Sequence, residues 1–240
     1  MKLQKKLFFA GMFFLIAVSV LVHWQWIIRP GIFTKGAWWY LSNEFFRDVL
    51  SAPKVLNGFD DFTIGALTPM FAPILAIGGL LTFFGDAFPI WERVVFLWPI
   101  AFLGVVPMYY LLYQKYNSIL GAIGGTLIYA FNSYIIARET AHLYIVVAYL
   151  ILAPLLFITV DRLIRKPSGK NGLFFTATTI AFSIFEIRIL YIFTLVLIAY
   201  AIYQYIQNKK LHSWHLVSTI LISFAVIILV QSYWLFPFLF

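Results

Sequence analysis

Apolar runs of about twenty residues recur along most of this chain, and they restrict its fold more than any other feature. A helix that crosses a bilayer needs roughly 20 consecutive, predominantly apolar residues. The 240 residues are 63% hydrophobic and only 11% charged, whereas a soluble domain carries about 25% charged residues. We therefore predict an all-α fold, a polytopic transmembrane helical bundle, for a multi-pass membrane protein.

Net charge and cysteine content bear on nucleic-acid binding and on cysteine chemistry. The net charge of +8 does not indicate nucleic-acid binding, because Lys and Arg in a membrane protein gather on the cytoplasmic side of the membrane. We accordingly expect membrane lipids as partners and no nucleic acid. The chain has no cysteine, so it has neither a disulfide nor a thiolate site.

Seven segments are long and apolar enough to be spans. They lie at about 7–28, 91–113, 118–135, 143–161, 172–187, 189–206 and 213–235. The first follows the basic start "MKLQKK" and continues into "HWQWIIRPG" without a small-residue cleavage site, which predicts an uncleaved signal anchor.

The apolar stretch from Ile64 to Phe84 is ambiguous. Pro69, Pro73 and the pair Gly78–Gly79 interrupt it, and broken helices at membrane depth are tolerated where protein or a cavity covers them. If the stretch is re-entrant or interfacial, the basic loop Arg162 to Lys170 falls inside. The positive-inside bias favours that arrangement, which gives seven spans with the N-terminus in the cytoplasm of a cell membrane.

This topology separates the charges and defines one long loop. Residues 29–90 become the first extracytoplasmic loop of a single transmembrane module, residues 1–240, and the apolar ending "QSYWLFPFLF" suggests the N-terminal part of a longer protein. Ten of the 17 cations lie inside: Lys2, Lys5, Lys6, Lys115, Arg162, Arg165, Lys166, Lys170, Lys209 and Lys210. Eight of the nine carboxylates lie outside: Glu44, Asp48, Asp60, Asp61, Asp86, Glu92, Glu139 and Glu186. The topology follows from the positions of Lys and Arg alone, so the separate clustering of the carboxylates on the outer side indicates where chemistry could occur.

Two short outer loops contain charged side chains. Glu186 and Arg188 in "FEIR" interrupt a long apolar region; they are either a wet external turn or, since ionisable groups near membrane depth are costly, part of a functional cavity. Arg138, Glu139 and His142 in "RETAH" could bind a lipid-linked phosphate through the arginine. The alternative is a juxtamembrane cap with a weak local ion pair.

The long loop contains the remaining candidates. Asp60 and Asp61 in "FDDF" could act as a general base or bind a divalent cation, or they form a solvated turn. Trp38, Trp39 and Tyr40 are either an interfacial aromatic belt or the floor of a sugar site. The four histidines are scattered, and no metal-binding or nucleotide-binding motif is present.

Several stretches together resemble integral-membrane glycosyltransferases of the GT-C type. They are "RPGIFTKG", "FDDFTIGALTPMF", "PIWERVVFLWPI", and "LIYAFNSYIIARETAH" followed by "YLILAPLLFI". Within that type, the stretches more closely resemble the group of α-(1→3)-arabinofuranosyltransferase-like proteins. This resemblance covers most of the chain and rests on a pattern of weak motifs.

The resemblance implies transfer of a sugar from a polyprenyl-phosphate donor to an extracytoplasmic glycan or lipid acceptor. It also implies an acid directly after Gly36, where this chain has Ala37. The carboxylates that could replace it are Glu44, Asp60 and Asp61. Arg138 and Arg188 would bind the donor phosphate and Trp38, Trp39 and Tyr40 the sugar. Such chemistry needs no cofactor, although a divalent metal remains an option.

A non-catalytic role is the alternative to an enzyme. Broken helices and buried charges also suit a transporter or a carrier of lipid-linked glycans, and Ala37 suits a degenerate partner subunit. One loop of about 60 residues outside, with only short loops inside, favours the transferase. The sequence leaves the oligomeric state open.

Overall fold

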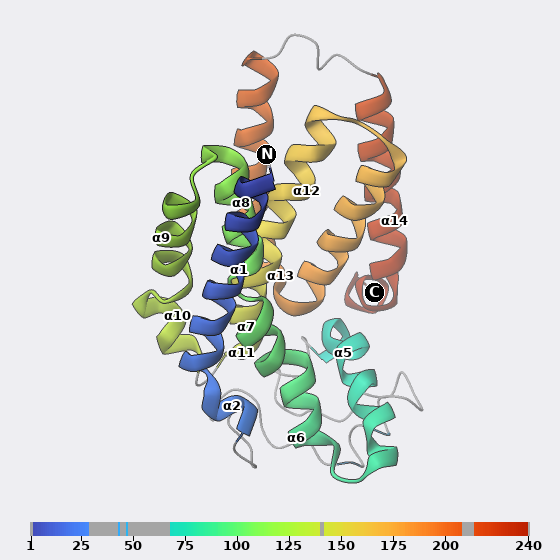
Figure 1. The fold of residues 1–240 in the computed structure, drawn as a ribbon. Helices are drawn as coiled ribbons and strands as arrows, with labels where there is room; N and C mark the ends of the chain where they lie inside the picture. Colours follow the sequence, from blue (N-terminus) through green and yellow to red (C-terminus); the bar gives the residue numbers. More distant parts are fainter. Residues whose placement is uncertain are drawn as a thin grey trace. The chain divides into compact units, whose positions relative to one another are not determined.

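The computed structural model describes residues 2–28, 43, 47, 68–139, 142–207 and 214–239, and every secondary-structure element in them is a helix (Figure 1). The predicted all-α fold is confirmed. Within these residues six helices are long and apolar enough to cross a membrane: Leu3–Val22, Ala87–Tyr116, Ile119–Arg138, Leu143–Arg165, Gly169–Gln204 and Trp214–Ser232. The chain is therefore a multi-pass membrane protein.

The helices group into two compact units, Met1–Ile151 and Leu152–Phe240. The first unit contains α1 (Lys2–Val22), α2 (Trp24–Ile28), α5 (Thr68–Leu81), α6 (Ala87–Glu92), α7 (Trp98–Leu103), α8 (Val106–Tyr116), α9 (Ile119–Ala130), α10 (Ser133–Arg138) and α11 (Leu143–Val147). A 3₁₀ turn, Thr82–Phe84, follows α5, and π-helical stretches occupy Arg93–Leu97 and Ala148–Leu152.

Prolines explain where the two π-helical stretches occur. Each ends directly before a helix whose second residue is proline, Pro99 in one case and Pro154 in the other. Proline has no N–H to donate and its ring clashes with the carbonyl four residues earlier, so a wider turn relieves the crowding. The Tyr129 hydroxyl donates to the carbonyl of Tyr149 at 2.6 Å. Pro154 has no N–H to donate to the Tyr149 carbonyl, so the Tyr129 hydroxyl supplies the hydrogen bond instead. In an apolar surrounding a backbone carbonyl needs such a partner.

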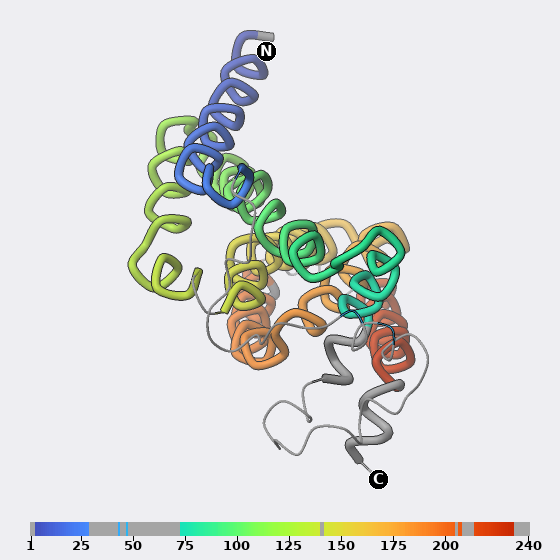
Figure 2. The backbone as a smooth tube through the Cα atoms, turned by 90° about the horizontal axis from the view of Figure 1, so that it is seen from below, coloured from blue at the N-terminus to red at the C-terminus, as the bar shows by residue number. Residues whose placement is uncertain are grey.

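Close packing of α1 against α8 depends on a glycine. Tyr109 is fully buried and its hydroxyl donates to the carbonyl of Phe8 at 3.0 Å. A Cβ at Gly11 would lie 2.6 Å from that hydroxyl oxygen, so only glycine leaves room for it. Figure 2 shows α1 beside α8 and α9. Small residues that let helices approach closely are typical of membrane bundles.

The second unit consists of α12 (Ala153–Arg165), α13 (Gly169–Gln207) and α14 (Trp214–Leu239). Helix α13 is not straight, because Glu186 within it has the extended backbone angles φ −162° and ψ 93°. The rings of Phe182 and Phe193 lie 6.2 Å apart, although 11 residues of straight helix span about 16 Å. The chain therefore reverses at Glu186, and Figure 1 shows both ends of α13 at the same end of this unit.

This reversal accounts for the difference between the seven predicted spans and the six long apolar helices. The segments predicted at 172–187 and 189–206 form one element, α13, with its break at Glu186. The parts before and after the break, 169–185 and 187–207, are about 26 and 32 Å long at 1.5 Å per residue. Each is close to the roughly 30 Å of a bilayer core.

Helices α13 and α14 meet along small and polar side chains. A Cβ at Gly172 would lie 2.5 Å from the methyl carbon of Thr219, and the Ser223 hydroxyl donates to the Gly172 carbonyl at 3.5 Å. Further along the pair, the Gln231 amide donates to the Ser183 hydroxyl. Hydrogen bonds of this kind between helices replace the hydrophobic effect, which gives little driving force inside lipid.

Helix α5 falls within the stretch predicted to be re-entrant or interfacial. Its 14 residues include Pro73, and at 1.5 Å per residue it is about 21 Å long. That length is short of the roughly 30 Å needed for a full crossing. The placement of Ile64 to Phe84 relative to a membrane stays a prediction.

In the first unit the charges divide between the two ends. Gln4 donates to Asn117 at 3.2 Å, which brings the lysines of the N-terminus near the turn after Lys115. At the opposite end, His23 lies 3.0 Å from Glu139. All three carboxylates described in this unit, Asp86, Glu92 and Glu139, belong to segments near that second end (Figure 1). The described carboxylates of this unit thus lie away from the N-terminal lysines, and their side of a cell membrane stays a prediction.

Cysteine labelling tests the predicted orientation, because the natural chain has no cysteine. Gly169 is exposed and a Cβ there meets nothing within 4 Å, and Ala137 is exposed at the other predicted side. We expect Ala137→Cys to react with a membrane-impermeant maleimide on intact cells, and Gly169→Cys to react only after permeabilisation. Labelling of Gly169→Cys on intact cells would contradict the topology.

Candidate functional site

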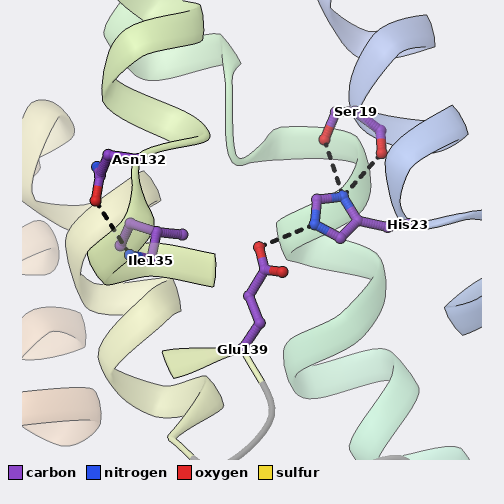
Figure 3. Close-up of polar contacts among 5 residues, drawn as sticks. All are labelled: Ser19, His23, Asn132, Ile135 and Glu139. Atoms are coloured by element: carbon purple, nitrogen blue, oxygen red, sulfur yellow. Dashed lines mark hydrogen bonds and ion pairs between the residues drawn. The ribbon is translucent and has the colours of Figure 1, made fainter. Parts of the chain in front are cut away.

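A buried histidine and a glutamate join the ends of α1 and α10 (Figure 3). His23 is 4% exposed, and its Nε2 lies 3.0 Å from Oε1 of Glu139. Its other ring nitrogen, Nδ1, lies 2.8 Å from the backbone carbonyl oxygen of Ser19. A carbonyl oxygen only accepts hydrogen bonds, so Nδ1 carries a hydrogen. The contact between Nε2 and Oε1 therefore requires a second proton, shared by the imidazole and the carboxyl group.

Aromatic rings flank the imidazole. The centroid of the Trp26 ring lies 4.3 Å from that of His23, and Phe131 is stacked at 6.2 Å. Glu139 keeps 13% of its side chain exposed. The pair thus has a closed side at His23 and a more accessible side at Glu139.

Asn132 fixes the direction of α10 and with it the position of Glu139. Its side-chain oxygen accepts a hydrogen bond from the Ile135 N–H at 3.1 Å, and its amide nitrogen donates to the Tyr129 carbonyl at 2.7 Å. One side chain therefore caps the start of α10 and also satisfies the end of α9. The six-residue α10 then presents Arg138 in its last turn, with Glu139 as the next residue.

Arg138 and Glu139 do not pair with each other. Neighbouring residues on a helix do not face one another, whereas residues four apart do. The Arg138 guanidinium accordingly lies 5.3 Å from the ring centroid of Tyr134, and Glu139 turns to His23. Among the residues that the structure describes, no carboxylate lies within 4 Å of the Arg138 guanidinium. In place of the local ion pair that was one of the two alternatives for "RETAH", the structure has a pair between positions 116 residues apart.

Glu186 and Arg188 form the second polar feature, at the break in α13. Glu186 is 3% exposed, and its carboxylate accepts hydrogen bonds from Nε and Nη2 of Arg188, both at 2.8 Å. It also accepts a hydrogen bond from the backbone N–H of Arg188 at 3.1 Å. Glu186 therefore caps the helix that follows the break and compensates the charge of Arg188. Two donors of the guanidinium are already used, which lowers its capacity to bind a phosphate.

Asn43 and Arg47 are held against the turn between α5 and α6. The Asn43 amide donates to the Gly85 carbonyl at 2.7 Å and accepts from the Ala87 N–H at 2.9 Å, so it caps the start of α6. Arg47 donates to the Thr82 hydroxyl at 3.3 Å. These hydrogen bonds attach two residues of the predicted first extracytoplasmic loop to the turn between α5 and α6.

Most of the predicted site residues lie outside the described residues. These are the proposed bases Glu44, Asp60 and Asp61, the aromatic residues Trp38, Trp39 and Tyr40, and Ala37. The two predicted donor-phosphate ligands, Arg138 and Arg188, are described, one in each unit. Within the described part of the chain, no group of three His, Asp or Glu side chains could hold a metal ion.

The sequence interpretation missed the pairing of His23 with Glu139. A local signal exists, since Ser19 and His23 are four residues apart and their hydrogen bond repeats the helical spacing. The partner on α10 could not be identified from spacing, because it depends on how α1 packs against the other helices.

The chain matches no protein-family model, no curated protein and no solved structure. The class of protein that the fold defines is a helical multi-pass membrane protein.

The Glu186 cap can be tested through stability. We expect Glu186→Ala to lower the stability of the purified protein in detergent, because loss of a capping residue costs about 0.5–2 kcal/mol and Arg188 loses its carboxylate partner. Thermal unfolding monitored by circular dichroism measures the change.

Arg165→Ala is the control for that measurement. Its side chain is 60% exposed and pairs with Asp161 four residues earlier on α12, and exposed pairs of this kind contribute about 0.3–0.5 kcal/mol. Equal effects of the two substitutions would contradict the assignment of Glu186 as a cap.

Proposed function

We propose that this chain is a membrane glycosyltransferase module that transfers a sugar from a polyprenyl-phosphate donor to an extracytoplasmic glycan or lipid acceptor. The observation that supports it best is the environment of Arg138. This cation keeps no carboxylate partner among the described residues, because Glu139 binds His23 instead. A permanently charged planar guanidinium is the side chain best suited to a phosphate.

The surroundings of Arg138 fit a lipid-linked sugar phosphate. Tyr134 is 47% exposed and offers an aromatic face directly beside the guanidinium. A stack of Tyr129 on Tyr149, with centroids 4.5 Å apart, lies next to Tyr134, whose ring is 6.3 Å from Tyr149. Aromatic faces suit sugar rings, and the apolar helix surfaces suit a polyprenyl chain.

In this proposal the residues act on a leaving phosphate and an attacking hydroxyl. Bond cleavage at the anomeric carbon leaves a second negative charge on the phosphate, which Arg138 stabilises. A base must take the proton of the acceptor hydroxyl. Glu44, Asp60 and Asp61 remain proposed bases from the sequence, and Trp38, Trp39 and Tyr40 a proposed sugar floor.

Binding of undecaprenyl phosphate to the chain in nanodiscs tests the proposal. We expect Arg138→Ala to weaken binding about tenfold or more, since a lost charge-assisted hydrogen bond costs about 1.5–3 kcal/mol. Arg188→Ala should have a smaller effect, because Glu186 already compensates the charge of Arg188.

Two controls accompany this measurement. Undecaprenol, which lacks the phosphate, should bind equally to the unmodified chain and to Arg138→Ala. Arg165→Ala should leave the affinity for undecaprenyl phosphate unchanged. If Arg138→Ala and Arg165→Ala behave alike, Arg138 is not the phosphate ligand.

Ala37 distinguishes an active enzyme from a degenerate one. The resemblance implies an acid at this position, and a well-placed base contributes about 10²–10⁴-fold. We expect Ala37→Asp to create or raise transfer from a polyprenyl-phosphate sugar, measured with radiolabelled donor.

The comparison variants for Ala37→Asp are Asp60→Ala and Asp61→Ala. If the unmodified chain transfers sugar and either alanine variant abolishes the transfer, the base lies in "FDDF" rather than at position 37. If no variant transfers sugar although undecaprenyl phosphate binds, the alternative of a non-catalytic carrier or partner subunit gains support.

A further inference from the structure

We propose that Glu139 and His23 are a proton-accepting pair, in which Glu139 receives the proton of the acceptor hydroxyl and His23 holds its carboxyl group in position. This inference rests on the proposed glycosyl transfer and names a base that the sequence did not indicate. It starts from the number of protons that the pair holds. Because the Ser19 carbonyl fixes the hydrogen on Nδ1, the 3.0 Å contact between Nε2 and Oε1 holds one shared proton.

The carboxyl group has a second oxygen that can take another proton. Among the described residues, His23 is the only hydrogen-bond partner of the Glu139 side chain. The Glu139 side chain is 13% exposed and that of His23 is 4% exposed. In this proposal a substrate hydroxyl therefore approaches the pair from the side of Glu139. Arg138, the proposed phosphate ligand, is the preceding residue, so the base and the phosphate cation come from the same end of α10.

The transfer step balances as follows. The O–H bond of the acceptor breaks and its proton goes to Oε2 of Glu139, while the electron pair stays on the acceptor oxygen. That oxygen forms a bond to the anomeric carbon of the sugar as the bond from this carbon to the phosphate oxygen breaks. The polyprenyl phosphate leaves with that electron pair. The Glu139–His23 pair then holds two protons, one on Oε2 and one on Nε2.

The elements near the pair contain further charged and titratable groups. They are Arg138 on α10, His142 directly before α11, Glu92 at the end of α6, and Arg93 at the start of the π-helical stretch that packs against α2. The Arg93 guanidinium donates to the Pro89 carbonyl at 2.7 Å. The backbone N–H of His142 donates to the backbone carbonyl of Arg138 at 2.8 Å. Neither of these two hydrogen bonds involves the side chain of His23 or of Glu139.

The first test needs no substrate. The full chain in nanodiscs is labelled with ¹⁵N-histidine and ¹³C-glutamate, and the pH is lowered from about 8 to about 5, the range in which histidine titrates. We expect a reversible change in the His23 ring resonances, in the Glu139 carboxyl infrared band, or in both. Glu139→Gln should remove the carboxyl band and alter the His23 response.

Ser19→Ala is the matched control, since it keeps the backbone carbonyl 2.8 Å from Nδ1 and removes only the hydroxyl, whose oxygen makes the longer, 3.5 Å contact with Nδ1. It should behave like the unmodified chain. If neither His23 nor Glu139 responds over this range in the unmodified chain, the pair cannot accept a second proton and the inference fails.

The second test is transfer with radiolabelled polyprenyl-phosphate sugar. We expect Glu139→Gln to lower kcat about 10²–10⁴-fold while the affinity for undecaprenyl phosphate stays unchanged, and His23→Gln to shift the acid limb of the pH profile of kcat. A kcat for Glu139→Gln within about threefold of the unmodified chain, below the roughly 10²-fold contribution of a general base, overturns the inference. Absence of transfer by every variant, Ala37→Asp included, counts against the glycosyl transfer, and the spectroscopic test still decides whether the pair takes up protons.

Discussion

Backbone hydrogen bonding in an apolar surrounding is the constraint on which the whole structure depends. A chain with 63% hydrophobic residues cannot leave peptide groups unsatisfied in lipid, so helices are the available solution. Each irregularity then needs a local compensation. The π-helical stretch before Pro154 has the Tyr129 hydroxyl on one of its carbonyls, and the reversal at Glu186 has that carboxylate on the N–H of Arg188.

The same constraint explains where the ionisable groups lie. A charge at membrane depth is costly unless it is paired, and the buried ionisable side chains with known partners follow this rule. His23 binds Glu139, and Glu186 binds Arg188. Both pairs lie where a helix ends or reverses, so each compensates a charge and also holds a helix terminus. Arg138 is half-buried and has no carboxylate partner within the described residues, and for that reason it is the centre of the proposed donor site.

The sequence predicted the class of fold and most of the spans, because apolar length is a local property. It also placed a turn at "FEIR", since Glu186 and Arg188 are the charges that interrupt an apolar region otherwise long enough for two spans. The sequence did not predict that Glu186 is the single non-helical residue of this turn. That conformation lets the Glu186 side chain accept a hydrogen bond from the Arg188 N–H and cap the following helix. The His23–Glu139 pair was also missed, because it joins residues 116 positions apart and depends on tertiary packing.

Helix geometry decides how "RETAH" divides its charges. Side chains at adjacent positions point about 100° apart around a helix with 3.6 residues per turn, so Arg138 and Glu139 cannot share one direction. Arg138 follows Tyr134 by four residues and lies over its ring, whereas Glu139 points to the end of α1 and meets His23 (Figure 3). Asn132 sets this division by capping α10 at its start. A one-residue shift of that cap would turn the two side chains by the same angle. The cap, the His23–Glu139 pair and the arginine, which has no carboxylate partner among the described residues, are therefore one arrangement rather than three separate features.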